Sequence, residues 1–237
     1  MTEIDPAPES TIPEIPALPE RSILGVSVRT AMVLLVFVVA FTTVMALTYQ
    51  STIDPIEAST QKEKLALIGE VLPAGSYDNT LLDDWVELPP TAALGLTDVR
   101  RIYRARQGGA PVALVLEAAA TDGYSGRIGL LLAVRVSGEL AAVRVTEHRE
   151  TPGLGDYIDL KKDKQKTRPW ITQFSGLNLD AVTPAKWRVK KDGGRFEQRA
   201  GATISARAVT NASGRALAWT KLNRDRVFAA ASGTRLN

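Results

Sequence analysis

The sequence predicts an α+β protein in which one N-terminal transmembrane helix precedes a single domain with a mainly antiparallel sheet and flanking helices. Three observations support this fold class. A long uncharged apolar run lies near the N-terminus, strand-length runs separated by glycine-containing turns occupy the middle, and a helix-forming pattern dominates the end. Strands that are followed by helices, without regular alternation, are typical of α+β domains.

The apolar run is long enough to cross a membrane as a helix. It extends from Thr30 to Tyr49, and the chain stays uncharged until Asp54, whereas about 20 apolar residues suffice to span the hydrocarbon core. We assign residues 23–50 to this transmembrane helix. Val44-Met45-Ala46 resembles a signal-peptide cleavage site, but the run exceeds the roughly 7–15 residues of a secretory h-region. A retained anchor is therefore preferred over a cleaved signal.

The charges that flank the span predict its orientation. Arg21 and Arg29 lie on the N-terminal side, and Asp54 and Glu57 follow the span. Because basic flanks stay in the cytoplasm, we place the N-terminus inside and the rest of the chain on the outer face. Residues 1–22 are rich in proline and acids and are predicted to form a disordered cytoplasmic tail.

Residues 51–97 are predicted to form a stalk that leads into the domain. The segment from Ile56 to Leu72 has helical spacing of apolar residues, and Pro73-Ala74-Gly75 is expected to end the helix. Asp83 and Asp84 are adjacent acids, which point in different directions on either regular element. We interpret them as a solvated turn and not as a pair of metal ligands.

Residues 98–237 are assigned to the domain itself. Four runs bounded by turn residues are predicted strands: Val99–Ala105, Pro111–Ala118, Ile128–Val136 and Leu140–Val145. Trp187–Gly194 is expected to form a further strand and turn. Ile204–Ala212 has the pattern of a helix, which Gly214 is expected to interrupt before Arg215–Val227 resumes it.

Composition excludes several classes of function. The chain has no Cys and one His, His148, which excludes cysteine-based zinc and iron–sulfur sites, c-type haem sites and any multi-histidine metal site. We therefore predict no metal site. The net charge of +3 is mild, and no basic stripe is interleaved with aromatic residues, so nucleic-acid binding is not indicated. The densest basic run, Lys161–Arg168, is interpreted as a solvated loop, with contact to anionic lipid headgroups or an acidic partner protein as the alternative.

One hydroxyl stands out at the start of the predicted C-terminal helix. Thr203 follows Gly201 and Ala202 and directly precedes the helical run. Unpaired N–H groups and the helix dipole favour a phosphate at such a position, and a glycine permits close approach to the backbone. On these residues alone, a plain helix cap is the commoner interpretation.

Three ordered sequence elements together resemble a known family. These are Gly123-Tyr124-Ser125-Gly126, then Glu150-Thr151-Pro152-Gly153-Leu154-Gly155, and finally the segment from Glu197 to Thr203 that ends in Gly-Ala-Thr. The chain resembles the FMN-binding domain shared by the G subunit of the Rnf (Rsx) electron-transport complex and the C subunit of the sodium-translocating NADH:quinone reductase. His148, shortly before the second element, resembles the Rnf subunit more closely.

The resemblance implies a covalent flavin. In this family a flavin transferase joins FMN by a phosphoester to the last threonine of the motif, which is Thr203 here. The chain departs from the motif at Glu197, where the family has Asp, and at Ala200, where it has Ser or Thr; the second change removes a hydroxyl. The implied cofactor-binding residues are Thr203, Gly201, Ala202, Ser205, Glu150, Thr151, Gly153, Leu154, Gly155 and Tyr124.

The resemblance also implies a role and a location. It implies an electron-relay subunit of a ferredoxin- and NAD-linked, redox-driven ion translocase, with other Rnf/Rsx membrane subunits as partners and no catalytic residue or independent activity of its own. The protein would be a single-pass protein of the bacterial inner membrane with a periplasmic C-terminal domain. The alternatives are the C subunit of the quinone reductase, a membrane-anchored adaptor domain without flavin, and, more remotely, a hydrolase whose base is His148.

Overall fold

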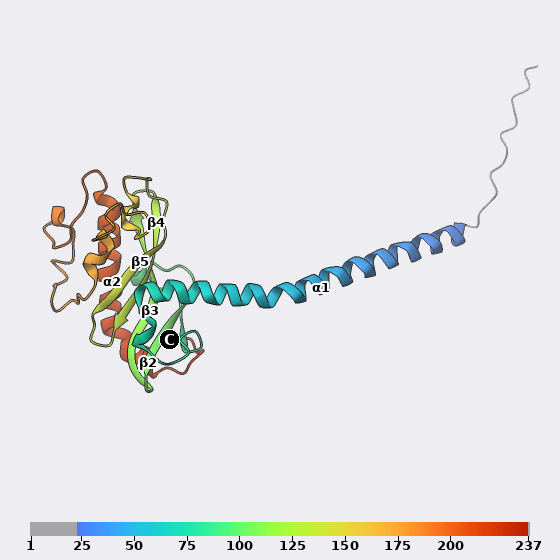
Figure 1. Cartoon of the computed structure of the whole chain (residues 1–237), viewed down its shortest axis with the longest axis horizontal. Helices are drawn as coiled ribbons and strands as arrows, with labels where there is room; N and C mark the ends of the chain where they lie inside the picture. The colour runs from blue at the N-terminus through green and yellow to red at the C-terminus, as the bar shows by residue number, and fades with distance from the viewer. Residues whose placement is uncertain (1–22, 237) are drawn as a thin grey trace, which may run out of the picture. The chain divides into compact units, whose positions relative to one another are not determined.

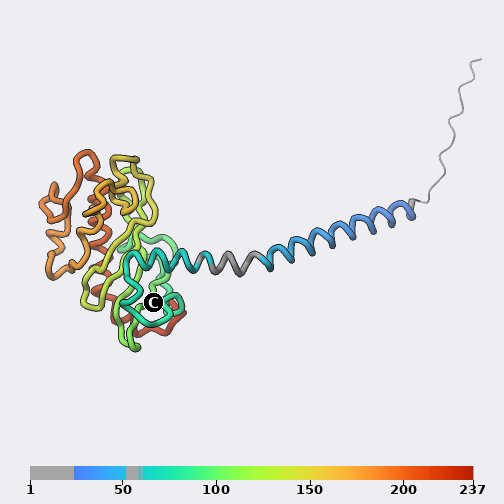
Figure 2. The backbone as a smooth tube through the Cα atoms, in the orientation of Figure 1, coloured from blue at the N-terminus to red at the C-terminus, as the bar shows by residue number. Residues whose placement is uncertain are grey.

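The computed structural model describes residues 23–236, except for the side chains of residues 52–58 and 60. The tail predicted at residues 1–22 lies outside the described residues. The chain divides into two compact units, residues 1–58 and residues 59–237, which are described separately; Figures 1 and 2 trace both.

The first unit consists, in its described part, of the N-terminal portion of helix α1, Ile23–Val71. Its segment Leu24–Ser51 contains an 18-residue window with a mean hydropathy of 2.5 and meets the length and composition of a membrane span. Three threonines in this segment, Thr30, Thr43 and Thr48, donate hydroxyl hydrogen bonds of 2.7–2.9 Å to carbonyls one turn earlier. A helix in lipid requires such internal partners, because hydrocarbon offers none.

The second unit contains a five-stranded sheet in which every neighbouring pair is antiparallel and the spatial order follows the chain. The strands are β1 Trp85–Leu88, β2 Arg100–Gln107, β3 Ala110–Gly123, β4 Gly126–Arg135 and β5 Leu140–Glu147. Helix α2, Thr203–Ala229, lies along the sheet (Figure 1). Between β5 and α2 the chain forms loops with short 3₁₀ turns at Asp156–Ile158, Trp170–Phe174 and Lys190–Asp192.

The sheet is buried on both faces, and alternate residues of its central strands point to different cores. Leu114 and Leu116 of β3 belong to the larger core, which includes buried residues of α2. Val115 belongs to the smaller core together with Ile68 and Val71 from the end of α1. The predicted helix stop is confirmed, since α1 ends at Val71, and its last turns cover one face of the sheet.

The four predicted strands are confirmed, with ends that differ by a few residues. Strand β1 was not predicted, because four residues are too few to establish an alternating pattern. Asp83 and Asp84 form the expected turn, but the side chain of Asp84 is only 19% exposed and forms ion pairs with Arg104 and Arg106. This carboxylate is therefore a structural partner and not a solvated group.

The strand expected at Trp187–Gly194 is wrong. Val189 makes one isolated bridge to Phe196, and the backbone then turns through the 3₁₀ segment Lys190–Asp192. Gly193 has a left-handed φ of 79°, and a Cβ on Gly194 would lie 2.0 Å from the carbonyl oxygen of Arg188. These two glycines close a tight loop, which an extended strand could not form.

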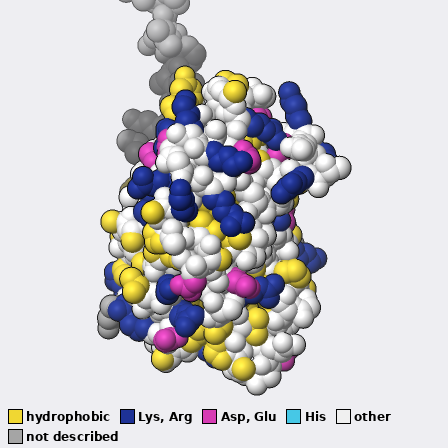
Figure 3. Space-filling view, turned by 90° about the vertical axis from the view of Figure 1, so that its left-hand side faces the viewer, with side chains coloured by type: hydrophobic (Ala, Val, Ile, Leu, Met, Phe, Trp, Pro, Cys, Tyr) yellow, Lys and Arg dark blue, Asp and Glu magenta, His cyan; other side chains and the backbone are white. Residues whose placement is uncertain are grey.

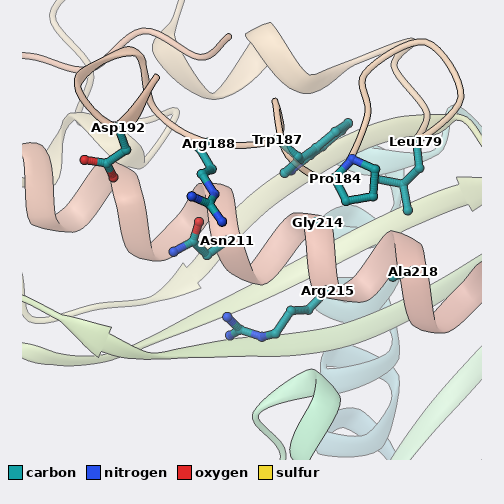
Figure 4. A pocket seen from close by; sticks show the side chains of 9 residues that line it. All are labelled: Leu179, Pro184, Trp187, Arg188, Asp192, Asn211, Gly214, Arg215 and Ala218. Atoms are coloured by element: carbon teal, nitrogen blue, oxygen red, sulfur yellow. The ribbon is translucent and has the colours of Figure 1, made fainter. Parts of the chain in front are cut away.

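The break expected at Gly214 is also wrong, because α2 continues through it. A Cβ at Gly214 would lie 2.5 Å from Cδ1 of Trp187, and Figure 4 shows the Trp187 ring lying over this part of α2. The glycine therefore makes room for an indole whose Nε1 donates to the carbonyl of Thr210 at 3.0 Å. Its role is close packing, which a propensity argument does not reveal.

Candidate flavin site

The loop that follows β5 and the start of α2 line one cavity of about 280 Å³. Its lining residues are Tyr124, Glu150, Thr151, Leu154, Gly155, Gly201, Ala202, Ile204 and Ser205. They come from three separate stretches of the chain, the β3–β4 turn, the loop at residues 150–155 and the start of α2. Eight of the ten residues that the sequence singled out therefore meet at one place.

Glu150 joins these three stretches through its carboxylate. The side chain of Ser205 donates to Oε2 at 2.5 Å, and the backbone N–H of Ser125 donates to Oε1 at 3.0 Å. Glu150 is 3% exposed and Ser205 is 1% exposed. Since a buried carboxylate is tolerated where hydrogen bonds satisfy it, this residue fixes the β3–β4 turn and the first turn of α2 against the loop.

Two glycines allow these groups to approach. A Cβ on Gly155 would lie 2.8 Å from Oγ of Ser205, and a Cβ on Gly123 would lie 2.9 Å from Oε1 of Glu150. Any larger residue at either position would push apart the hydrogen-bonded pair. Gly153 and Gly201 contribute in another way, with left-handed φ values of 75° and 83° that turn the chain on each side of the cavity.

Thr203 is the first residue of α2 and is partly exposed. The helix cap is Ala202, and no side chain caps this end of the helix. Within the described part of the chain, the Thr203 hydroxyl makes no hydrogen bond, so the interpretation of Thr203 as a helix cap does not hold. Thr203 and Gly153 adjoin the cavity-lining residues in sequence without being among them.

A set of contacts that the sequence analysis missed holds the segment before α2 in place. The phenol oxygen of Tyr157 accepts from the N–H of Arg199 at 3.1 Å and donates to the carbonyl of Ala202 at 3.2 Å. The Arg199 guanidinium lies over the Tyr157 ring at 4.5 Å. Burial raises the pKa of Tyr157, so the phenol stays protonated and keeps its donor. In the sequence, the only sign of these contacts was a tyrosine two residues after the loop at residues 150–155.

Asp163 anchors the same segment from the basic loop. It is fully buried and accepts from the N–H groups of Trp170 at 2.7 Å and Gln165 at 2.9 Å, and from Arg199 at 2.6 Å. Burial alone would raise the pKa of Asp163, but these hydrogen bonds and the Arg199 charge outweigh it and hold the pKa below its usual value. The loop at residues 161–168 is therefore attached to the flavin motif and is not merely solvated.

His148 supports the loop and does not resemble a catalytic base. Its Nδ1 accepts from the N–H of Glu150 at 3.1 Å, and its Nε2 lies 3.2 Å from Nζ of Lys162 and 3.8 Å from Oδ2 of Asp159. Among the described residues, no hydroxyl forms a hydrogen bond with the ring, so a nucleophile–base pair is not formed there. The described residues also contain no group of three or more potential metal ligands of the His, Cys, Asp and Glu types.

The chain matches known proteins over most of its length. The model of the FMN-binding domain family matches residues 123–218, and that of the RnfG N-terminal region matches residues 26–71. The G subunit of the ion-translocating oxidoreductase complex of Pseudoalteromonas atlantica is 39% identical over 207 residues, which cover 87% of this chain and 94% of the relative. The same subunit of Pseudomonas aeruginosa is 43% identical over 201 residues, with 85% and 92% covered.

Further matches are similar in kind. The G subunit of the complex in Escherichia coli K12 is 44% identical over 183 residues, with 77% of this chain and 85% of the relative covered. Among solved structures, the crystal structure of Shewanella oneidensis NqrC aligns with a TM-score of 0.43 at 18% identity, over 66% of this chain and 74% of that one.

The α+β fold, the cavity and the matched domain define an FMN-binding protein, and its described residues include one candidate transmembrane helix. The chain belongs to the family of the G subunit of the ion-translocating oxidoreductase (Rnf) complex. This membership decides between the two subunits that share the resembled FMN-binding domain, in favour of the G subunit of the Rnf complex.

The residues at the cavity suit FMN. A volume of about 280 Å³ lies just below the usual 300–1,000 Å³ of ligand sites, so the cavity has room for part of an FMN molecule. The apolar side chains at the opening are exposed, Tyr124 by 67%, Leu154 by 49% and Ile204 by 42%, and can pack against a flat ring. Free N–H groups at the start of α2 suit a phosphate.

Proposed function

We propose that this chain is an electron-relay subunit of a membrane-bound, ion-translocating oxidoreductase complex linked to ferredoxin and NAD, and that it carries FMN joined by a phosphoester to Thr203. The observation that carries the proposal is the shared cavity, in which the loop at residues 150–155 and the start of α2 meet beside a hydroxyl with no partner of its own in the described chain. Family membership supports the oxidoreductase complex. FMN supplies one-electron chemistry, which nicotinamides do not readily perform.

The protein's own groups would hold and orient the cofactor. Thr203 would carry the FMN phosphate as an ester: the flavin transferase would join the Thr203 oxygen to the phosphorus of its flavin donor, the bond from that phosphorus to the donor's leaving group would break, and the leaving group would take up the hydroxyl proton. The N–H groups of the first turn of α2 would hold the phosphate. Gly201, two residues before the attachment point, turns the backbone there with its left-handed φ of 83°. Glu150, bound to Ser125 and Ser205, keeps the loop at residues 150–155 against the same helix end.

The departures from the family motif are compatible with this role. Ala200 is exposed and Glu197 has a side chain that is 65% exposed and paired with Lys190. Neither side chain lines the cavity. Both positions are therefore accessible at the surface to a flavin transferase that recognises them. A domain that has the fold but no flavin is the alternative that these departures keep open.

The tether is tested with the full chain co-produced with a flavin transferase. Intact mass should show the addition of FMN less one water, and the band should fluoresce after denaturing electrophoresis. Thr203→Val should abolish both signals because it removes the attacking oxygen, whereas Thr203→Ser should retain them. Thr151→Val is the matched control, since it removes a hydroxyl from the same cavity and should keep the adduct.

The result of this experiment separates the proposals. An adduct that persists in Thr203→Val would contradict attachment at Thr203. An unmodified wild-type chain beside a flavinylated positive control would favour the adaptor without flavin.

We further propose that the C-terminal domain lies in the periplasm of a bacterial inner membrane. The support is Arg21 before the candidate span Leu24–Ser51 and Arg29 near its N-terminal end. Because the chain has no Cys, a single Ser175→Cys substitution in an exposed loop provides a unique label. A membrane-impermeant maleimide should label it in intact spheroplasts; labelling only after permeabilisation would reverse the orientation.

A further inference from the structure

The excess positive charge of the chain lies in one sequence segment. This segment separates the loop at residues 150–155 from the start of α2, the two stretches that line most of the flavin cavity. Residues 161–199 contain eleven Lys and Arg and four Asp and Glu, a balance of +7, whereas the whole chain has +3. Figure 3 shows more Lys and Arg side chains than acidic ones on the side of the molecule that contains the loops between β5 and α2. The rest of the chain is therefore net acidic, so the excess is local.

The two ends of this segment meet around one hollow of about 460 Å³, which we call the basic hollow. It is lined by Gln165, Arg168, Pro169, Trp170, Thr172, Gln173, Lys190, Arg195, Phe196, Glu197, Gln198 and Arg199. Four of these are cationic and one is anionic. The remaining polar members are amides and a threonine, which can donate hydrogen bonds to carboxylates.

Two of the cations have no internal counter-charge. Arg199 is bound to the buried Asp163, and Lys190 pairs with Glu197. Arg168 and Arg195 are exposed, and neither guanidinium makes an ion pair or hydrogen bond within residues 23–236. Arginine presents a planar fork that binds carboxylates in a bidentate manner, so the hollow retains two free carboxylate-binding groups.

Two aromatic residues that line the hollow are buried and well packed. Trp170 and Phe196 are 7% and 1% exposed and both pack against Phe174. The indole Nε1 of Trp170 donates to the carbonyl of Glu197 at 2.6 Å, and the side chain of Gln173 accepts from the N–H of Glu197 at 2.8 Å. The two basic segments are thereby tied together, and the hollow is preformed for a partner.

The basic hollow and the flavin cavity are lined in part by consecutive stretches of the sequence. Glu197, Gln198 and Arg199 line the hollow, and Gly201 and Ala202 line the flavin cavity. A protein that occupies the hollow would therefore lie beside the segment that leads to Thr203.

We propose that the basic hollow is the docking site for an acidic surface of another protein of the same complex, whose Asp or Glu side chains bind Arg168 and Arg195. A protein fits better than a membrane surface for two reasons. The binding groups line a concave site, and no large exposed hydrophobic residue that could enter a bilayer lies among residues 161–199. The choice of the complex as the partner's source rests on the proposed function.

The test uses the full chain in native membranes that contain its complex. A photo-crosslinking amino acid at Gln165, which is exposed at the hollow, should form an adduct with another protein of the complex. Arg168→Glu combined with Arg195→Glu should lower the yield by about tenfold or more, as should about 1 M salt, because both remove the electrostatic attraction. Arg135→Glu combined with Arg235→Glu changes the charge equally at exposed arginines outside the hollow and should leave the yield unchanged.

Three results would overturn the proposal: no protein adduct at Gln165, a yield that the Arg168 and Arg195 reversals do not change, or an equal loss in the control pair. An adduct with lipid in place of protein would assign the hollow to the membrane instead. The experiment is repeated in Thr203→Val, in which the yield should be unchanged. Docking and flavin attachment can therefore fail separately.

Discussion

At the scale of single residues, Asp163 is the clearest electrostatic contribution to the fold. Its folded-state pKa lies below its ordinary value of 3.8, so its stabilisation is fully present above about pH 4 and is lost as the pH falls through the lower folded-state value. Asp163→Asn should lower the free energy of unfolding by at least about 2 kcal/mol near neutral pH. The amide nitrogen of the asparagine would face an N–H group that now donates to a carboxylate oxygen, so two donors would meet. Unfolding of the full chain in detergent, followed as a function of pH, measures both effects.

The matched control is Asp180→Asn, which removes an exposed carboxylate that pairs with Lys221. This change should stay within about 0.5 kcal/mol. Equal losses for the two variants, or an Asp163→Asn variant whose acid sensitivity below pH 4 matches that of the wild type, would show that the buried contacts are not the cause.

Glu150 is expected to act through its two hydrogen bonds more than through its charge. Glu150→Ala leaves the Ser125 N–H and the Ser205 hydroxyl without their acceptor in a buried site, which should cost about 2–4 kcal/mol. Glu150→Gln can keep both bonds, since its oxygen accepts from Ser125 and its amide donates to Ser205, and should cost less than about 1 kcal/mol. Glu147→Ala, at a nearby exposed position, serves as the control.

The readouts for Glu150 are the unfolding midpoint and the yield of the FMN adduct. Both should fall in the alanine variant and be largely retained in the glutamine variant. A glutamine variant as impaired as the alanine variant would mean that the negative charge itself is required.

At the scale of elements, α2 depends on a glycine that helix propensity disfavours. Alanine is favoured over glycine in a helix by about 1 kcal/mol, yet Gly214→Ala places a methyl 2.5 Å from Trp187, and overpacking costs about 1–3 kcal/mol. Gly214→Ala should therefore lower stability. Gly69→Ala is the matched control, since a Cβ there meets nothing within 4 Å in the same type of element.

Gly69→Ala should raise the free energy of unfolding by about 0.5–1 kcal/mol. Thermal unfolding of the two variants should shift in opposite directions. A Gly214→Ala variant that is stabilised would show that the Trp187 ring moves aside at little cost.

The elements also show which features could be predicted from sequence. Strands β2 to β5 were predictable because apolar runs of strand length lie between glycine turns. The loop at residues 150–155 and the start of α2 were assigned to one site only through the family resemblance, since periodicity gives no long-range contact. Trp187 and Gly214 were predicted wrongly because each is explained by the other, 27 residues away.

The C-terminus of α2 illustrates the same limit. The Arg104 side chain donates to the carbonyls of Val227 at 3.0 Å and Ala230 at 2.5 Å, and Arg106 donates to that of Phe228 at 3.2 Å. Two arginines of β2 thus satisfy carbonyls that the helix leaves free. The sequence alone indicates only exposed charges on a strand, because the partners follow more than 120 residues later.

At the scale of the whole molecule, the helix that contains the candidate membrane span also contributes its last turns to the core of the domain with the five-stranded sheet. Ile68, Val71 and Leu72 are 3%, 1% and 0% exposed and pack in the core that covers the second face of the sheet. A chain that begins at Ser59 retains this cover and lacks the candidate span at Leu24–Ser51. It should be soluble, folded and competent for flavin attachment.

A chain that begins at Pro73 should behave differently. Burial of each large aliphatic side chain contributes about 1.5–3 kcal/mol, so losing three of them should remove several kcal/mol, a large share of the total stability of a domain. The exposed sheet face should also promote aggregation. Circular dichroism, thermal unfolding and size-exclusion chromatography of the two chains compare these outcomes directly. If the shorter chain unfolds at the same temperature as the longer one, the end of α1 does not stabilise the domain, and the domain would be complete without it.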